Sequence, residues 1–201
     1  SNPDRHLICF GTETTIGTTS TQDPMFIRWS DQDDFNSWTA SATNSAGSQR
    51  VTGGSKIVTA VSTRGQILFL TDTSAHGMSF IGAPFTFGFQ KLGTNCGAVS
   101  PHCAVDISGI IYWMSSDGFY MFDGTVRKMP CTVEDFVFDN IDTTQLEQVY
   151  AGSNSAYGEV MWFYCSTDSN QIDRYVIFNY QENLWYTGSL DRSTWIDSGT
   201  Y

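Results

Sequence analysis

The stretch GIIYWMSSDGFYMFDG, residues 109–124, places nine bulky apolar side chains in sixteen positions but divides them into two short runs. Residues 110–114 form the first run and residues 119–122 form the second, with a Ser-Ser-Asp-Gly break between them. Short runs rich in aromatic and β-branched residues, separated by an Asp-Gly pair, are typical of two strands joined by a tight turn. The stretch therefore predicts a β-hairpin.

Paired apolar runs of this kind occur four times in the chain. They are residues 7–10 with 25–29, 67–70 with 78–81, 110–114 with 119–122, and 160–164 with 175–178. The pairs begin about 40 to 60 residues apart, and repetition on this scale with several short strands per unit is typical of β-propeller blades. The opening stretch is thus the predicted middle hairpin of a repeated unit.

The flanks of these pairs complete the unit. Strand-like stretches at 57–61, 104–107 and 149–151 precede three of the pairs, and Gly65, Gly109 and Gly158 lie in the turns that follow. Glycine supplies the positive φ that tight hairpins require. A further strand is predicted after each pair, at 37–40, 85–89, 126–129 and 184–187. The unit is therefore four antiparallel strands with apolar inner strands.

These patterns predict an all-β fold, a β-propeller of four-stranded antiparallel blades, with three complete blades and most of a fourth. The expected blades cover approximately residues 1–41, 56–93, 103–130 and 148–190, within one propeller domain, or part of one, at 1–201. The first unit lacks its leading strand, and an open ring exposes sheet edges. We expect either a four-bladed ring closed by a strand from the C-terminal end or further blades elsewhere in a longer polypeptide, and the missing start favours the second.

Two segments interrupt the repeat. Thr132 and Asp135 have the spacing of a capping box, with Asp in place of Glu, and apolar residues follow, so we expect one or two short helices within 132–149. Residues 42–55 are rich in Gly, Ser, Thr and Asn, which predicts a loop.

Composition and charge limit the possible partners. The chain has 201 residues, with 10 basic and 21 acidic side chains and a net charge of −11. The basic residues are scattered, and so acidic a surface repels phosphate, which disfavours direct nucleic-acid binding. No apolar run approaches the about 20 residues of a membrane helix, so no membrane segment is predicted.

The cysteines do not have the spacing of a metal or disulfide framework. No C-x-x-C pair is present, and we predict mostly buried, reduced thiols of a protein made in a cytosol. The five are Cys9, Cys96, Cys103, Cys131 and Cys165.

No motif predicts catalytic, cofactor-binding or metal-binding residues, and we do not expect an enzyme. His6, His76 and His102 share no spacing and are predicted to be solvated loop residues. Residues 115–118 differ from the Asp-box turn of sialidase-type propellers, because Gly follows Asp directly and no Trp closes the motif. Residues 31–36 carry carboxylates at alternate positions, as calcium-binding loops do. They lack the central Gly and the distal Glu of such loops.

The tryptophans suggest packing more than sugar binding. Trp113 and Trp162 lie inside apolar runs, and Trp38 and Trp185 occupy equivalent positions in the predicted outer strands, so we expect packing between blades. The alternative is that sugars stack on exposed tryptophan rings. The remaining two tryptophans are Trp29 and Trp195.

Several stretches resemble β-propeller virion proteins that form the hub or nozzle of tailed-bacteriophage tails. The similar stretches are residues 2–6, 27–38, 44–48, 112–114 with 119–124, and 173–185. The resemblance implies a structural, non-enzymatic protein of the virion tail, made in the host cytoplasm. It also implies a homo-oligomeric ring around the tail channel, contacts with other tail or adaptor proteins, and DNA only as passing cargo.

Two other functions stay open at the level of sequence. A carbohydrate-binding or adhesive β-propeller would display Trp or Tyr side chains at loop tips. A glycoside-cleaving enzyme would bring two carboxylates to one pocket.

Overall fold

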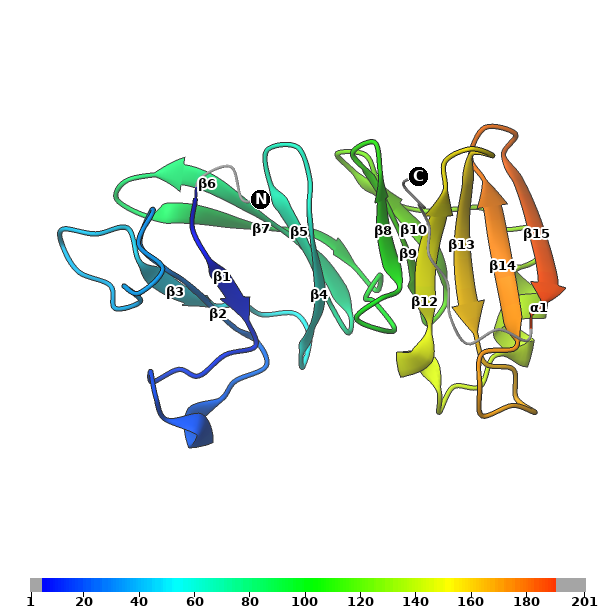
Figure 1. Ribbon diagram of the computed structural model, residues 1–201, viewed down its shortest axis with the longest axis horizontal. Helices are drawn as coiled ribbons and strands as arrows, with labels where there is room; N and C mark the ends of the chain where they lie inside the picture. The colour runs from blue at the N-terminus through cyan, green and yellow to red at the C-terminus, as the bar shows by residue number, and fades with distance from the viewer. Residues whose placement is uncertain (1–4, 191–201) are drawn as a thin grey trace, which may run out of the picture. The chain divides into compact units, whose positions relative to one another are not determined.

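The computed structural model describes residues 5–190, which form four antiparallel β-sheets, one α-helix and two short 3-10 helices (Figure 1). The chain divides into two compact units, Ser1–Asn95 and Cys96–Tyr201, each with two sheets. The predicted all-β class is confirmed, with sheets of three or four strands. The closed propeller stays a prediction.

The first unit contains a three-stranded and a four-stranded sheet. The strands of the first, in spatial order, are β1 (Ile8–Phe10), β2 (Phe26–Trp29) and β3 (Gly47–Arg50). The second has β4 (Ile57–Ser62), β5 (Ile67–Thr71), β6 (Ser74–Gly82) and β7 (Thr86–Thr94). Apolar side chains of both sheets form one core, made of Met25, Ile27, Trp29, Val51, Phe69, Met78 and Phe87.

The second unit contains two four-stranded sheets. One has β8 (Ala104–Ile107), β9 (Ile110–Ser115), β10 (Gly118–Phe122) and β11 (Val126–Lys128). The other has β12 (Tyr150–Asn154), β13 (Glu159–Tyr164), β14 (Arg174–Asn179) and β15 (Leu184–Ser189). Phe119 joins the two sheets, because its ring centroid lies 4.8 Å from that of Trp162 and 4.8 Å from that of Trp185.

The hairpin predicted from residues 109–124 is confirmed as β9 and β10. Phe119 pairs with Met114 and Phe122 with Ile111 across the two strands. Glycines of the predicted turns adopt the left-handed conformation that a tight turn needs, with φ of 91° at Gly65, 92° at Gly109 and 69° at Gly158.

The predicted outer strand of the first sheet is wrong. Residues 37–40 lie in a loop, and the strand is β3, inside the stretch predicted to be a loop. Local side-chain bonds fold the loop: Asn44 donates its amide to the Thr39 carbonyl (2.9 Å), and Trp38 donates its indole N–H to the Phe35 carbonyl (2.8 Å). Such bonds compete with strand pairing.

Short helices do form where predicted, as α1 (Glu134–Asn140) and the 3-10 helix Leu146–Gln148. The capping box predicted from Thr132 and Asp135 is wrong. Val133 is the N-cap residue, and no side chain caps the helix. Thr132 therefore lies one residue before the position from which its hydroxyl would cap α1. Glu134, in the first turn of α1, instead accepts a hydrogen bond from the Lys128 ammonium group (2.9 Å).

Candidate interaction surface

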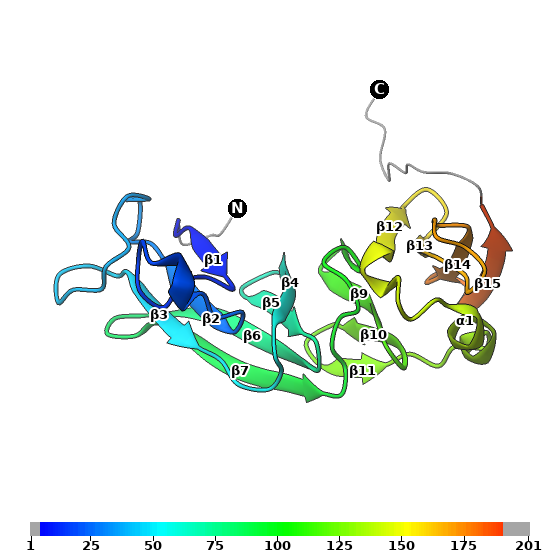
Figure 2. The ribbon, with the colours of Figure 1, turned by 90° about the horizontal axis from the view of Figure 1, so that it is seen from below.

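The β6–β7 hairpin extends past the rest of its sheet. β5 pairs with β6 only from Ala75 to Met78, whereas the β6–β7 pairing continues to Gly82 and Thr86. The two strands run side by side in both ribbon views (Figures 1 and 2). The end of this ribbon therefore has no neighbouring strand from β5.

Three apolar side chains are exposed at the end of the ribbon, and we call them the hairpin tip. Phe80 is 41% exposed, Ile81 57% and Phe85 72%. Exposed apolar groups that lie close together can form a site for contact with another protein. The hairpin tip is the candidate interaction surface of the first unit.

Aromatic packing holds the inner side of the ribbon in place. The Phe87 ring centroid lies 5.3 Å from Trp29 and 5.1 Å from His6, and that of Phe80 lies 5.8 Å from His6. Thr86 donates its hydroxyl to the Ser45 carbonyl (3.0 Å). Because these contacts fix the ribbon, the hairpin tip is presented in a defined orientation.

The histidine prediction is wrong for two of three residues. His6 is 4% exposed and His76 is 5% exposed, whereas His102 is exposed, as predicted. His76 stacks on Phe69, with ring centroids 5.0 Å apart, and His6 packs against Phe80 and Phe87. The aromatic neighbours bury both imidazoles.

Ser74 and His76 form a pair with the residue types of a nucleophile and its base. His76 Nε2 lies 2.9 Å from the Ser74 hydroxyl oxygen. Burial, followed by the nearby Lys91 charge, lowers the pKa of His76. Ser74, however, is 1% exposed and donates its hydroxyl proton to the Gly53 carbonyl. The pair therefore fixes the turn at Gly53.

The acidic residues at 31–36 are directed to separate partners. Asp31 accepts hydrogen bonds from the Ser45 amide (2.8 Å) and hydroxyl (2.6 Å), which lower the pKa of its carboxyl. Asp33 pairs with Arg5 (2.9 Å), and Asp34 accepts from the Asn36 amide (3.0 Å). Between residues 5 and 190, no three His, Cys, Asp or Glu side chains gather as a possible metal site.

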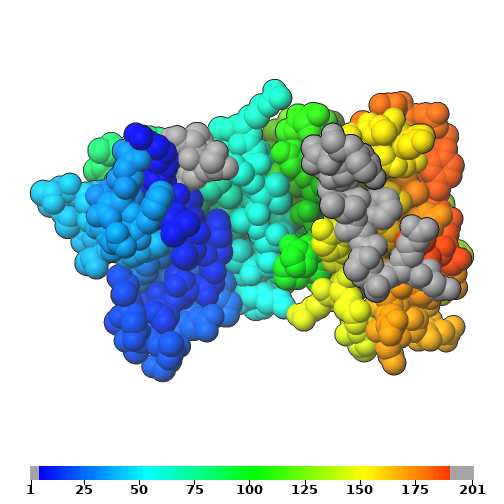
Figure 3. All heavy atoms as spheres, viewed as in Figure 1, coloured from blue at the N-terminus to red at the C-terminus, as the bar shows by residue number. Residues whose placement is uncertain are grey.

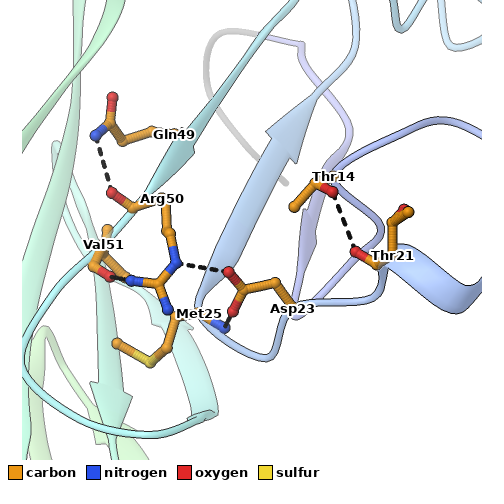
Figure 4. Close-up of polar contacts among 7 residues, drawn as sticks. All are labelled: Thr14, Thr21, Asp23, Met25, Gln49, Arg50 and Val51. Carbon is orange, nitrogen blue, oxygen red and sulfur yellow. Dashed lines mark hydrogen bonds and ion pairs between the residues drawn. The ribbon is translucent and has the colours of Figure 1, made fainter.

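A second polar cluster joins the start of β2 to the end of β3 (Figure 4). The Asp23 carboxylate accepts from the Met25 amide (2.9 Å) and from Arg50 Nε (2.6 Å). The amide of Met25, and then Arg50, lower the pKa of Asp23. These hydrogen bonds join the two strand ends, and Asp23 is the one carboxylate in this cluster.

Among the cavities of the described residues, one lies in each unit. One of about 290 Å³ is lined by Cys9, Phe10, Gly11, Thr12, Glu13, Thr19 and Gln22. The other, of about 240 Å³, is lined by Met121, Arg127, Lys128, Met129, Pro130, Phe178 and Asn183. Neither lining contains the two carboxylates that glycoside hydrolysis requires.

The predicted packing between sheets is confirmed for Trp162 and Trp185, which both contact Phe119 of the neighbouring sheet, whereas Trp113 stacks on Tyr120 of its own sheet. Trp113 and Trp162 are 0% exposed and Trp185 is 8% exposed. Trp38 is half-buried in a loop, so its predicted outer-strand position is wrong. Trp195 lies outside the described residues.

The cysteines are free thiols, and most are buried as predicted. Cys96, Cys103 and Cys165 are buried, Cys131 is half-buried and Cys9 is exposed.

Comparison with protein-family models and with curated proteins finds no match to this chain. No helix in the described part of the chain is long and apolar enough to cross a membrane.

Proposed function

We propose that this protein is a structural component of a bacteriophage virion tail, of the hub, nozzle or adaptor kind. In this proposal its sheets are blades of a β-propeller, and its subunits form a ring around the tail channel and contact neighbouring tail proteins. It is made in the host cytoplasm and acts in the virion. The resemblance of residues 27–38, and of 112–114 with 119–124, to tail propellers supports this assignment.

The hairpin tip is the observation that carries the contact role. Phe85 is 72% exposed at the turn end of a ribbon in which Phe87 packs against Trp29. An exposed apolar group on a ribbon that is held by packing adds to the apolar area that a partner covers, which favours protein–protein association. This supports a subunit that works through contacts.

The repeated sheets and the charge are consistent with the proposal. Three sheets have four antiparallel strands in consecutive chain order, which supports the assignment of blades. A net charge of −11 supports DNA as passing cargo, because acidic walls repel the phosphate backbone.

The test is the assembly state of the purified chain. Light scattering and negative-stain electron microscopy, with and without candidate tail proteins produced from the same genome, would detect a ring. We expect particles with rotational symmetry and a central channel. A chain that stays monomeric and binds none of those proteins contradicts the proposal.

A carbohydrate-binding propeller is the second candidate. Tyr157, 68% exposed in the turn between β12 and β13, is the residue that favours it. The burial of Trp113, Trp162 and Trp185 gives it less support, because those rings are covered by protein. Glycan binding that is lost in Tyr157→Ala, in a chain that forms no ring, would favour this function.

A further inference from the structure

The sheet of β8–β11 contains the dipeptide Asp-Gly twice. Asp117 and Gly118 lie where β9 turns into β10, and Asp123 and Gly124 lie in the turn between β10 and β11. In an Asp-Gly pair the glycine amide nitrogen can attack the aspartate carboxyl group, because glycine has no Cβ to hinder the approach. The two pairs have the same sequence, so their surroundings decide which of them reacts in the folded protein.

The Asp123 carboxylate folds over the amide of Gly124. Its Oδ1 accepts a hydrogen bond from the amide of Thr125, two residues along the chain (3.4 Å). An aspartate that bonds two residues ahead curls around the intervening peptide, so its carboxyl carbon lies beside the nitrogen of that peptide. The Asp123 carboxyl carbon is therefore directed toward the nitrogen that would attack it.

The Gly124 amide is available for this reaction. Among residues 5–190, no group accepts a hydrogen bond from it, and nothing approaches within 4 Å of the position that a Cβ at residue 124 would occupy. Residues 123–125 are exposed, and the part of the second unit drawn in green reaches the surface in the space-filling view (Figure 3). Solvent can therefore remove the amide proton of Gly124.

The other pair is held by its neighbours. The Asp117 carboxylate accepts a hydrogen bond from the Tyr120 hydroxyl (3.1 Å). Lys128 Nζ donates to the main-chain oxygen of Asp117 (2.6 Å), which fixes the peptide that contains the Gly118 nitrogen. Gly118 is buried in β10, where it pairs with Ser115, and the Lys128 side chain fills the space beside it. The Gly118 nitrogen is thus enclosed and its peptide is fixed.

We propose that Asp123 is a site of spontaneous isomerisation in the folded chain and that Asp117 is protected from it. The Gly124 nitrogen forms a bond to the carboxyl carbon of Asp123, and the amide proton leaves with the carboxyl hydroxyl as water. Water then opens the succinimide ring. Attack at the main-chain carbonyl breaks the original peptide bond and leaves isoaspartate, whereas attack at the side-chain carbonyl restores aspartate. The reaction consumes no other reagent, and the proposal does not depend on the tail function.

Isoaspartate at residue 123 alters the pairing of β11. The main chain then passes through the former side-chain carbons, which lengthens the turn between Phe122 and Val126, two residues that pair across β10 and β11. The carboxylate that forms an ion pair with Arg127 is also displaced. Because β11 has three residues and lies at the edge of its sheet, its position depends on this turn.

The test compares the folded chain with the chain unfolded in guanidinium chloride, both aged for several weeks at neutral pH and physiological temperature. Mass spectrometry with electron-transfer fragmentation locates isoaspartate at each position. In the folded chain we expect it to accumulate about tenfold or more faster at Asp123 than at Asp117, because the paired and buried Gly118 reacts only after local opening. In the unfolded chain the two positions should react at similar rates.

Asp123→Glu provides the matched control. Glutamate keeps the negative charge, but its carboxyl group would have to close a larger and less favourable ring, so residue 123 should form no detectable isomer while Asp117 behaves as in the native chain. Equal rates at the two aspartates of the folded chain, or a faster reaction at Asp117, overturn the proposal. So does an Asp123 that isomerises only after unfolding, or not at all.

Discussion

Trp29 donates its indole N–H to the main-chain oxygen of Ser45 across 2.9 Å, and this bond joins the buried strand β2 to the loop before β3. The same oxygen accepts the Thr86 hydroxyl (3.0 Å), and the Ser45 amide and hydroxyl bond to Asp31. Ser45 is therefore a junction between the first sheet, its long loop and the β6–β7 hairpin. This junction fixes the turn end of the ribbon, next to the hairpin tip.

Gly47→Ala should destabilise the first unit. A Cβ at residue 47 would lie 2.5 Å from Cζ2 of the buried Trp29, so the indole or β3 would have to move. Overpacking of this kind costs about 1–3 kcal/mol, measurable by urea unfolding. The exposed neighbour Ser48 provides the control, since Ser48→Ala should change the unfolding free energy by less than about 0.5 kcal/mol. Equal stability of the two variants would contradict the close approach of β3 to Trp29.

Phe119→Ala should destabilise the second unit much more than Phe136→Ala. Phe119 is 0% exposed and contacts Trp162 and Trp185, whereas Phe136 is 57% exposed on α1. Removing a buried phenyl ring costs about 3–5 kcal/mol, and the exposed site should cost less than about 0.5 kcal/mol. Denaturant unfolding followed by tryptophan fluorescence measures both. Similar losses from the two changes would argue against Phe119 as a core residue.

The double variant Ile81→Ser, Phe85→Ser should lose association with partner proteins while keeping its fold. Both side chains are mostly exposed, so their replacement removes little buried area. Sedimentation velocity with the partner identified in the assembly experiment measures the loss. Phe136→Ser, an exposed apolar residue of the second unit, is the matched control and should bind normally. Undiminished binding by the double variant would exclude the hairpin tip as the contact surface.

The contribution of Asp31 to stability should disappear at low pH. The hydrogen bonds from Ser45 hold the pKa of Asp31 below its ordinary value in the folded state. The ionised carboxylate therefore stabilises the fold above the unfolded-state pKa of about 3.9, and this stabilisation is lost as the pH falls through the lower folded-state pKa. Thermal melts of the native protein and Asp31→Asn should differ near neutral pH and converge in acid. A constant difference across that range would contradict this assignment.

Thiol labelling should distinguish three classes of cysteine. Cys9 is exposed and should react first in the folded protein. Burial raises the pKa of Cys131 to about 11, so its thiolate is scarce at neutral pH and it should react slowly. Cys96, Cys103 and Cys165 are buried and should react only after unfolding. Mass spectrometry after brief maleimide treatment measures the order, and rapid labelling of Cys103 would contradict its burial.

Much of the fold could be predicted from the sequence because the inner strands are continuous apolar runs bounded by glycine turns. β8 was predicted with its observed bounds, Ala104–Ile107. β3 was missed because Gly-Ser-Gln-Arg has no apolar alternation, and its position depends on the space beneath Trp29. Sequence-local patterns do not contain that information.

The candidate site was less predictable. The hairpin tip depends on how far β6 and β7 extend past β5, which is a matter of register. The apolar residues Ile81 and Phe85 on either side of a turn were the available signal. Likewise, His76 is buried by stacking on Phe69, a residue of another strand.

Each of the four sheets found between residues 5 and 190 is built from strands that follow one another directly in sequence. Each can therefore assemble from a single continuous segment of the chain, without pairing to a distant one. During synthesis, one sheet can finish forming before the ribosome has delivered the next. Folding can then proceed stepwise from the N-terminal side, one sheet after another.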